Sequence, residues 1–260
     1  MTSNLVWIVP LALLVGMVLG GLGGGGAILT VPILVYLLHQ EPSHATAGSL
    51  IIVGLASAIG LFAHRAAGNV RFEDGIVFGL TGIAGSFVGS KLSAVVEPAV
   101  LMTAFGLLML LVAGLMLRKR AADRQCPDCE RNADRKGLPV LLVTATGVGF
   151  LTGFFGVGGG FAVVPALVLA LGYSMPVAVG TSLVVIVVNS LTALAARAAS
   201  GLDIDWPLIL VFGAVAAAGS LLGGRLAGKI DQRHLSLAFT ILLFLVSAYV
   251  LAINVPALLA

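Results

Sequence analysis

Two glycine-rich segments contain the residues in this chain most able to bind a ligand. Each could interrupt a helix and leave the next helix with a free N-terminus, where unpaired N–H groups and the helix dipole favour an anion. Hydroxyl and amide side chains follow each segment. The candidate substrate-binding residues are Gly23, Gly24, Gly25, Gly26, Ser49, Gly156, Gly158, Gly159, Gly160, Thr181, Ser182 and Asn189.

Both segments lie inside uncharged stretches that are too long for one membrane helix. Residues 5–38 contain no Asp, Glu, Lys or Arg, and neither do residues 138–171. A straight helix over 5–38 would extend about 51 Å, but a bilayer core is about 30 Å thick. Consecutive glycines are also poor helix formers, at about 1 kcal/mol each relative to Ala. We therefore expect helices over 5–19 and 27–38 with a break at 20–26.

Each candidate residue also has a structural interpretation. The glycines could serve only close helix packing, as small residues do in membrane helices. The hydroxyls of Ser49, Thr181 and Ser182 could bond back to carbonyls of their own helices. Asn189 could bridge two helices instead of contacting substrate. The sequence leaves these alternatives open.

The composition places the chain in a membrane. Hydrophobic residues make up 59% of the 260 residues and charged residues 10%, against about 25% charged in soluble domains. This composition excludes a cytosolic enzyme, a nucleic-acid binder and a disordered chain. The fold class we predict is an all-α polytopic membrane protein in the cell membrane. Six further spans are predicted at 43–64, 74–92, 98–117, 177–196, 206–226 and 234–253.

The chain contains an internal repeat. At an offset of 133 residues, positions 20–50 match positions 153–183 with 12 identities in 31. With one residue inserted, 84–92 falls on 218–226, so Gly85 and Gly89 match Gly219 and Gly223. Generic apolar similarity would not place glycines and prolines in register. We predict one repeat over 1–117, a hydrophilic linker over 118–136 and a second repeat over 137–260, as is typical of transporters.

The basic residues favour inverted repeats. If each break makes a re-entrant helix pair followed by three spans, 12 of the 14 basic residues fall on one side, including seven in the 118–136 loop. If the chain instead crosses at each break, it forms eight spans in parallel 4+4 repeats, and ten fall on one side. Basic loops are cytoplasmic, so the first arrangement is favoured and the 118–136 loop is predicted to be cytoplasmic.

At these motifs the sequence resembles the sulfite exporter TauE/SafE family. The resemblance lies in GLGGGGAILTVPIL and GFFGVGGGFAVVPAL, each followed by Ala-x-x-x-Ser-Leu, and covers both halves. The first copy departs from the second by placing Gly48 where Thr181 supplies a hydroxyl. The resemblance implies a secondary transporter that exports a small sulfur-containing or organic anion. A passive anion channel remains the alternative, and protons are a candidate coupling ion.

The remaining chemistry is sparse. Cys126 and Cys129 are weak metal or redox candidates, because one Cys-x-x-Cys pair supplies two of the usual four zinc ligands unless a homodimer completes the site. The titratable residues lie near predicted span ends, where solvated interfacial positions are expected: Glu41, His44, His64, Glu73, Asp74, Asp203 and Asp205. We expect no enzyme activity, no cofactor and no nucleic-acid partner, and lipid is the expected environment.

Overall fold

The computed structural model describes residues 2–38, 40–93, 95–125, 137–155, 160–198 and 206–259, and every regular element in these ranges is a helix. Seven of the helices are long and apolar enough to cross a membrane. The elements are α1 (Thr2–Leu22), α2 (Gly25–Pro32), η1 (Ile33–Leu37), α3 (Pro42–Ala66), α4 (Phe72–Ser93), α5 (Pro98–Gln125), α6 (Leu138–Phe155), α7 (Gly160–Leu169), α8 (Met175–Ala198), α9 (Trp206–Ala227) and α10 (Gln232–Leu259).

The six spans predicted outside the glycine segments correspond to α3, α4, α5, α8, α9 and α10. One boundary differs. Helix α5 continues to Gln125, so residues 118–125 are helical instead of belonging to the hydrophilic loop. Ala, Arg, Lys and Gln are strong helix formers, and the helix-breaking Pro127 comes only afterwards.

The break in the first uncharged stretch is shorter than predicted. Helix α1 extends through Gly20 and Gly21 to Leu22, and only Gly23 and Gly24 separate it from α2. Gly23 has φ +71°, a left-handed conformation that glycine adopts without steric cost. The prediction of a break over 20–26 was therefore too wide, because two residues suffice to reverse the chain.

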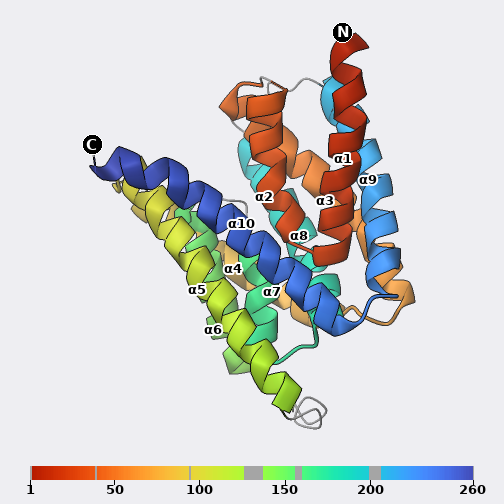
Figure 1. The fold of residues 1–260 in the computed structure, drawn as a ribbon, viewed down its shortest axis with the longest axis vertical. Coiled ribbons are helices and arrows are strands. Elements are labelled where there is room, and N and C mark those ends of the chain that lie inside the picture. Colours follow the sequence, from red (N-terminus) through yellow and green to blue (C-terminus); the bar gives the residue numbers. More distant parts are fainter. Residues whose placement is uncertain are drawn as a thin grey trace.

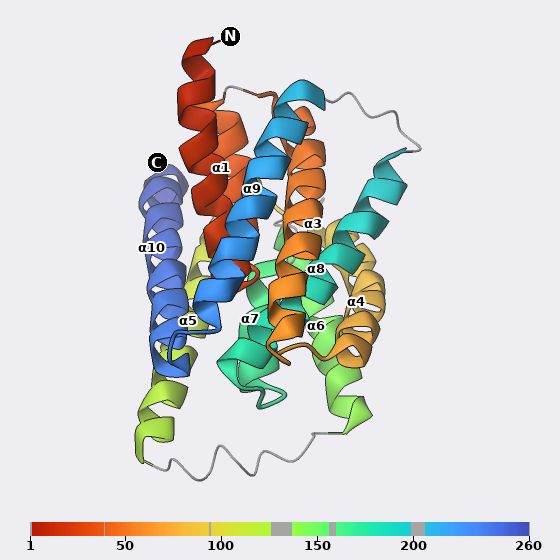
Figure 2. The same cartoon turned by 90° about the vertical axis from the view of Figure 1, so that its right-hand side faces the viewer.

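Helices α1 and α2 form an antiparallel hairpin (Figure 1). Helix α1 begins at the upper end of the molecule, reaches the interior and turns back, so 5–38 is not one continuous helix. Helices α6 and α7 also contact each other, but α6 begins at the lower end, near the connection that follows α7 (Figure 2). The two hairpins thus enter the molecule from opposite ends.

Helix α1 packs along α9 with backbone against backbone. Gly16 and Gly20 lie directly against the backbone of Ala216 and Ser220, where any Cβ atom would overlap a carbonyl group. Small residues permit such close approach, and in a bilayer this packing replaces the hydrophobic effect as a driving force for helix association.

Helix α6 packs along α4 in the same manner. Gly149 and Gly153 lie directly against the backbone of Gly82 and Ser86. These contacts have the same register as those between α1 and α9, because 16 and 20 fall on 149 and 153 at the repeat offset. We call the α1–α9 and α4–α6 contacts the glycine seams.

The buried apolar side chains form two clusters, and each combines helices from both halves of the chain. One contains Phe105 of α5 against Phe155 and Phe161 of the second hairpin, with ring centroids 5.4 and 5.0 Å apart. The outward-facing side chains are also apolar, including Phe62, Phe87 and Leu245. A surface of this kind suits contact with lipid chains.

The α4–α6 glycine seam predicts that two glycines of α6 differ in how much their substitution destabilises the protein. Gly149→Leu should lower the free energy of unfolding by at least about 1–3 kcal/mol, because the new side chain overlaps the backbone of Gly82. Gly147 has no heavy atom within 4 Å of a Cβ position, so Gly147→Leu should leave the Tm in detergent unchanged or slightly raised. Equal Tm values for the two variants would contradict this account of the seam.

Candidate functional site

The two hairpin tips meet in the interior of the molecule. Gly24, the N-cap of α2, lies directly against the backbone of Gly160, the first residue of α7. The Gly24 Cα lies 3.0 Å from a Cβ position built on Gly160. Both glycines are buried, so neither position can accept a side chain without separating the tips.

Helix α2 begins with an N-terminus that no side chain caps. Gly26 and Ala27 donate weak backbone hydrogen bonds to the carbonyl oxygens of Gly23 and Gly24, at 3.5 and 3.3 Å. Helix N-termini carry about half a positive charge. The tip therefore presents an electropositive backbone at the centre of the bundle.

The structure brings two further predicted residues together at this tip. A Cβ atom on Gly23 would meet the Ser182 hydroxyl of α8 and would lie 3.0 Å from Val164 Cγ2 of α7. Gly25 instead faces Leu242 of α10, and Gly26 faces Leu19 of α1. Among the described residues, Gly23 and Gly24 thus lie against predicted site residues of the second half, Ser182 and Gly160.

The hydroxyl groups of Ser49 and Ser182 bond to carbonyl groups of their own helices in this conformation. Ser49 Oγ donates to the Thr46 carbonyl oxygen at 2.8 Å, and Ser182 Oγ donates to the Val179 carbonyl oxygen at 2.7 Å. Both donors are satisfied within their own helices. Anion binding by either hydroxyl would require rotation of its side chain away from these carbonyls.

The other candidates are less informative. Asn189 is half-buried on α8, and its backbone carbonyl oxygen accepts a hydrogen bond from Thr192 Oγ1 at 3.0 Å. Gly156, Gly158 and Gly159 lie outside the described residues, as do Cys126, Cys129, Asp203 and Asp205.

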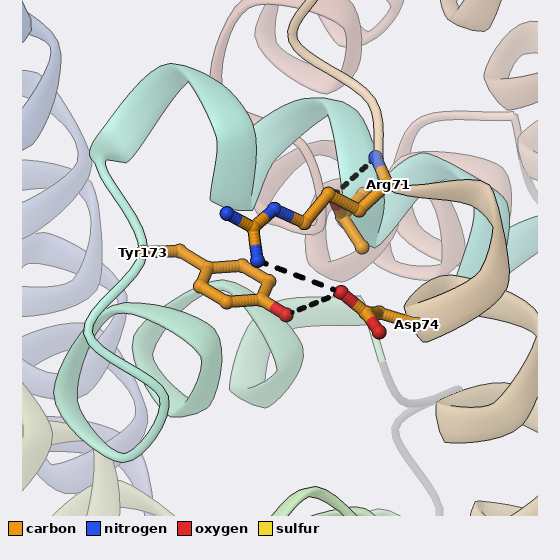
Figure 3. A network of polar contacts seen from close by, with 4 residues as sticks. Arg71, Asp74 and Tyr173 are labelled. Atoms are coloured by element: carbon orange, nitrogen blue, oxygen red, sulfur yellow. Dashed lines mark hydrogen bonds and ion pairs between the residues drawn. The ribbon is translucent and has the colours of Figure 1, made fainter. Parts of the chain in front are cut away.

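Thr181 belongs to a polar network that joins both halves of the chain, in which Figure 3 labels Arg71, Asp74 and Tyr173. Thr181 Oγ1 accepts a hydrogen bond from the Arg71 backbone N–H at 3.2 Å. Tyr173, in the connection between α7 and α8, donates to Asp74 Oδ2 of α4 at 2.6 Å, and the Arg71 guanidinium lies over the Tyr173 ring at 4.5 Å. Arg71 Nη1 and Asp74 Oδ2 are 3.7 Å apart. Burial, with a smaller contribution from the Asp74 carboxylate, raises the pKa of the Tyr173 phenol, so it remains a donor.

His64 is buried, which contradicts its expected solvated position. Its side chain is 1% exposed at the junction of α1, α3 and α9, and Nε2 lies 2.7 Å from the Gly20 carbonyl oxygen. Position along the chain suggested a solvated end because His64 lies in the last turn of α3. The signal that sequence reasoning missed is the pair Gly20 and Gly224, whose small size lets α1 and α9 close over the imidazole ring.

Comparison with known proteins gives consistent results across nearly the whole chain. A profile described as "Sulfite exporter TauE/SafE" matches residues 8–250. A "Probable membrane transporter protein" of Xylella fastidiosa is 34% identical over 246 residues, covering 92% of this chain and 91% of the relative.

Two further relatives are less similar in sequence. The "Probable membrane transporter protein YunE" of Bacillus subtilis is 29% identical over 94% of this chain and 96% of its own length. A relative in Methanocaldococcus jannaschii with the same general description is 26% identical over 94% of this chain and 96% of its own length. No solved structure matches.

The apolar helices identify a multi-pass membrane protein. Together with the profile match and the relatives of nearly equal length, they show that the chain is a membrane transporter protein of the sulfite exporter TauE/SafE family.

Proposed function

We propose that this chain is a secondary transporter that exports a small anion such as sulfite or an organosulfonate. The observation that carries the proposal is the meeting of the two hairpin tips, Gly24 against Gly160, at the centre of the bundle. Helices α2 and α7 both begin there, so two electropositive helix ends would converge on one anion. The family's description as a sulfite exporter supports the direction and the substrate class.

We further propose that the chain consists of two inverted repeats, each with a re-entrant hairpin followed by three spans. The matched registers of the glycine seams and the opposite entry of the hairpins support this arrangement. Inverted repeats give a transporter two related conformations that differ in which side is open. Substrate would bind near the midplane, where the hairpin tips lie.

The tip contact favours alternating access over a passive channel. Gly23, Gly24 and Gly160 are all buried, and the backbones touch, so the tips must separate before an anion can reach the amides. A transporter that opens and closes in this way should exchange internal for external anion and saturate with substrate. A permanently open pore would do neither.

Adding a methyl group at the tip should therefore block transport. We expect Gly24→Ala to lower ³⁵S-sulfite or sulfoacetate flux in proteoliposomes by about tenfold or more, because the methyl group occupies the space of the Gly160 backbone. Gly114→Ala on α5 is the matched control, since its Cβ position has no neighbour within 4 Å. Full flux in Gly24→Ala would show that the Gly24–Gly160 contact is not needed for transport.

The orientation can be tested with the only two cysteines, Cys126 and Cys129. We propose that this loop is cytoplasmic because basic residues concentrate around it. A membrane-impermeant maleimide should label the wild-type protein in inside-out vesicles but not in intact cells. In a variant with both cysteines replaced by Ser, Val95→Cys between α4 and α5 should show the reverse pattern, because Val95 is 79% exposed at the opposite end of α5. Labelling of the native cysteines in intact cells would invert the proposed topology.

A further inference from the structure

The buried histidine beside the first hairpin has one ring nitrogen with a partner and one without. The Gly20 carbonyl oxygen can only accept, so the 2.7 Å contact requires that His64 Nε2 carries the hydrogen. Nδ1 of the neutral ring is then a lone pair. Nδ1 has no hydrogen-bonding partner among the described residues, although the side chain is 1% exposed.

Two more buried polar atoms lie along the same helix interface. Ser57 precedes His64 by two turns on the same face of α3, with Gly60 between them. Ser220 of α9 places its Oγ against Gly60. Within the part of the chain that is described, neither Ser57 Oγ nor Ser220 Oγ has a hydrogen-bonding partner, and both side chains are fully buried. Three unpaired polar groups at one interface are unusual, since buried polar groups are normally paired.

The carbonyl beside His64 favours a cation. Gly20 lies in the last turn of α1, where carbonyl oxygens have no intrahelical donor and the helix dipole is negative. Protonation of Nδ1 would form an imidazolium ring that still donates from Nε2 to Gly20. The ring would therefore keep its existing hydrogen bond in both protonation states.

The charged groups around His64 are arginines at the ends of neighbouring elements. One is Arg71, in the segment after α3, whose backbone N–H donates to Thr181 next to Gly180, and the Cβ position of Gly180 lies 3.2 Å from His64 Cβ. Helices α1 and α2 contain no titratable residue. Arg65 follows His64 on α3, and Arg225 follows Gly224 on α9, and both are exposed. The remaining titratable residues in the elements packed against α3 are His44 in the first turn of α3, Tyr36 in η1 and Arg197 in the last turn of α8.

We propose that His64 is the proton-binding residue that couples anion movement to a proton gradient. The inference rests on the proposed transport function and adds its coupling group. Hydronium would donate a proton to Nδ1 on the inner side of the membrane, and the imidazolium would return it to water on the outer side as the anion leaves. The proton and the anion then leave together, so the outward anion gradient drives export. An O–H bond of hydronium breaks as the Nδ1–H bond forms, the reverse happens on release, and one proton moves in each cycle.

The geometry also explains why proton and anion would bind together. His64 contacts the carboxyl end of α1 at Gly20, while the amino end of α2 begins at Gly25 across a two-residue turn. The break therefore presents a site for a cation and a site for an anion within a few residues. A proton on His64 and an anion at the amino end of α2 have opposite charges, so each would raise the affinity for the other.

The proton-binding step can be measured without any transport assay. Wild-type protein with ¹⁵N-labelled histidine is reconstituted in nanodiscs, and the His64 signal is identified among the four histidines by its loss in His64→Gln. We expect the Nδ1 signal to titrate reversibly within the pH range over which the protein stays folded. A ring that stays neutral across that whole range would overturn the proposal.

The coupling step is tested with sulfoacetate, whose sulfonate remains ionised at these pH values. With the membrane potential clamped at zero, one proton per anion and a gradient of one pH unit should sustain about a tenfold concentration ratio in wild-type proteoliposomes. His64→Gln should reduce this ratio to about one while retaining exchange of internal for external sulfoacetate, because Gln can donate to Gly20 but cannot take up the proton. His234→Gln, at an exposed histidine of α10, should behave as wild type.

Three results would separate the two proposals. A normal concentration ratio in His64→Gln would overturn proton coupling by His64, and so would loss of exchange in a correctly folded variant. If the wild-type protein moved neither sulfoacetate nor sulfite, the transport proposal would fail. The titration of His64 would still decide whether the residue binds a proton.

Discussion

The close approach of one backbone to another is the constraint on which the rest of this structure depends. In a bilayer, apolar side chains gain nothing by leaving lipid for a helix interface, so association depends on close packing. Glycines on α1, α4, α6 and α9 bring these helices into backbone contact along the two glycine seams. Because α1 packs on α9 and α6 on α4, each hairpin's first helix is held by the other half of the chain.

A second consequence follows from interrupting a helix inside an apolar protein. The break at Gly23 and Gly24 exposes a negative helix end and a positive helix end at the same depth. Such backbone must be buried in protein or line a wet cavity. Here the positive end meets the second hairpin tip, and the negative end meets His64. The proposed anion and proton sites are thus two parts of one structural feature.

The polar residues divide by their role in the structure. Thr181 accepts the Arg71 backbone N–H, and Tyr173 donates to Asp74, so these groups tie the connection after α3 to α8 and the connection after α7 to α4. Ser49 and Ser182 donate to their own helices. Hydroxyls at the predicted spacing are therefore not sufficient evidence of a ligand site, whereas an unpaired buried atom such as His64 Nδ1 requires a physical explanation.

The sequence by itself determined the membrane class, six of the spans and the existence of the first break, because hydropathy, charge and helix propensity act locally. It also indicated the family through the paired glycine motifs, which the profile match over residues 8–250 confirms. It could not determine that the first break is only two residues wide, since helix α1 tolerates Gly20 and Gly21 by packing against α9. It also could not show that His64 is buried, or that Gly24 meets Gly160. Those facts depend on helices far apart in the chain, and only the tertiary structure decides which backbones come into contact.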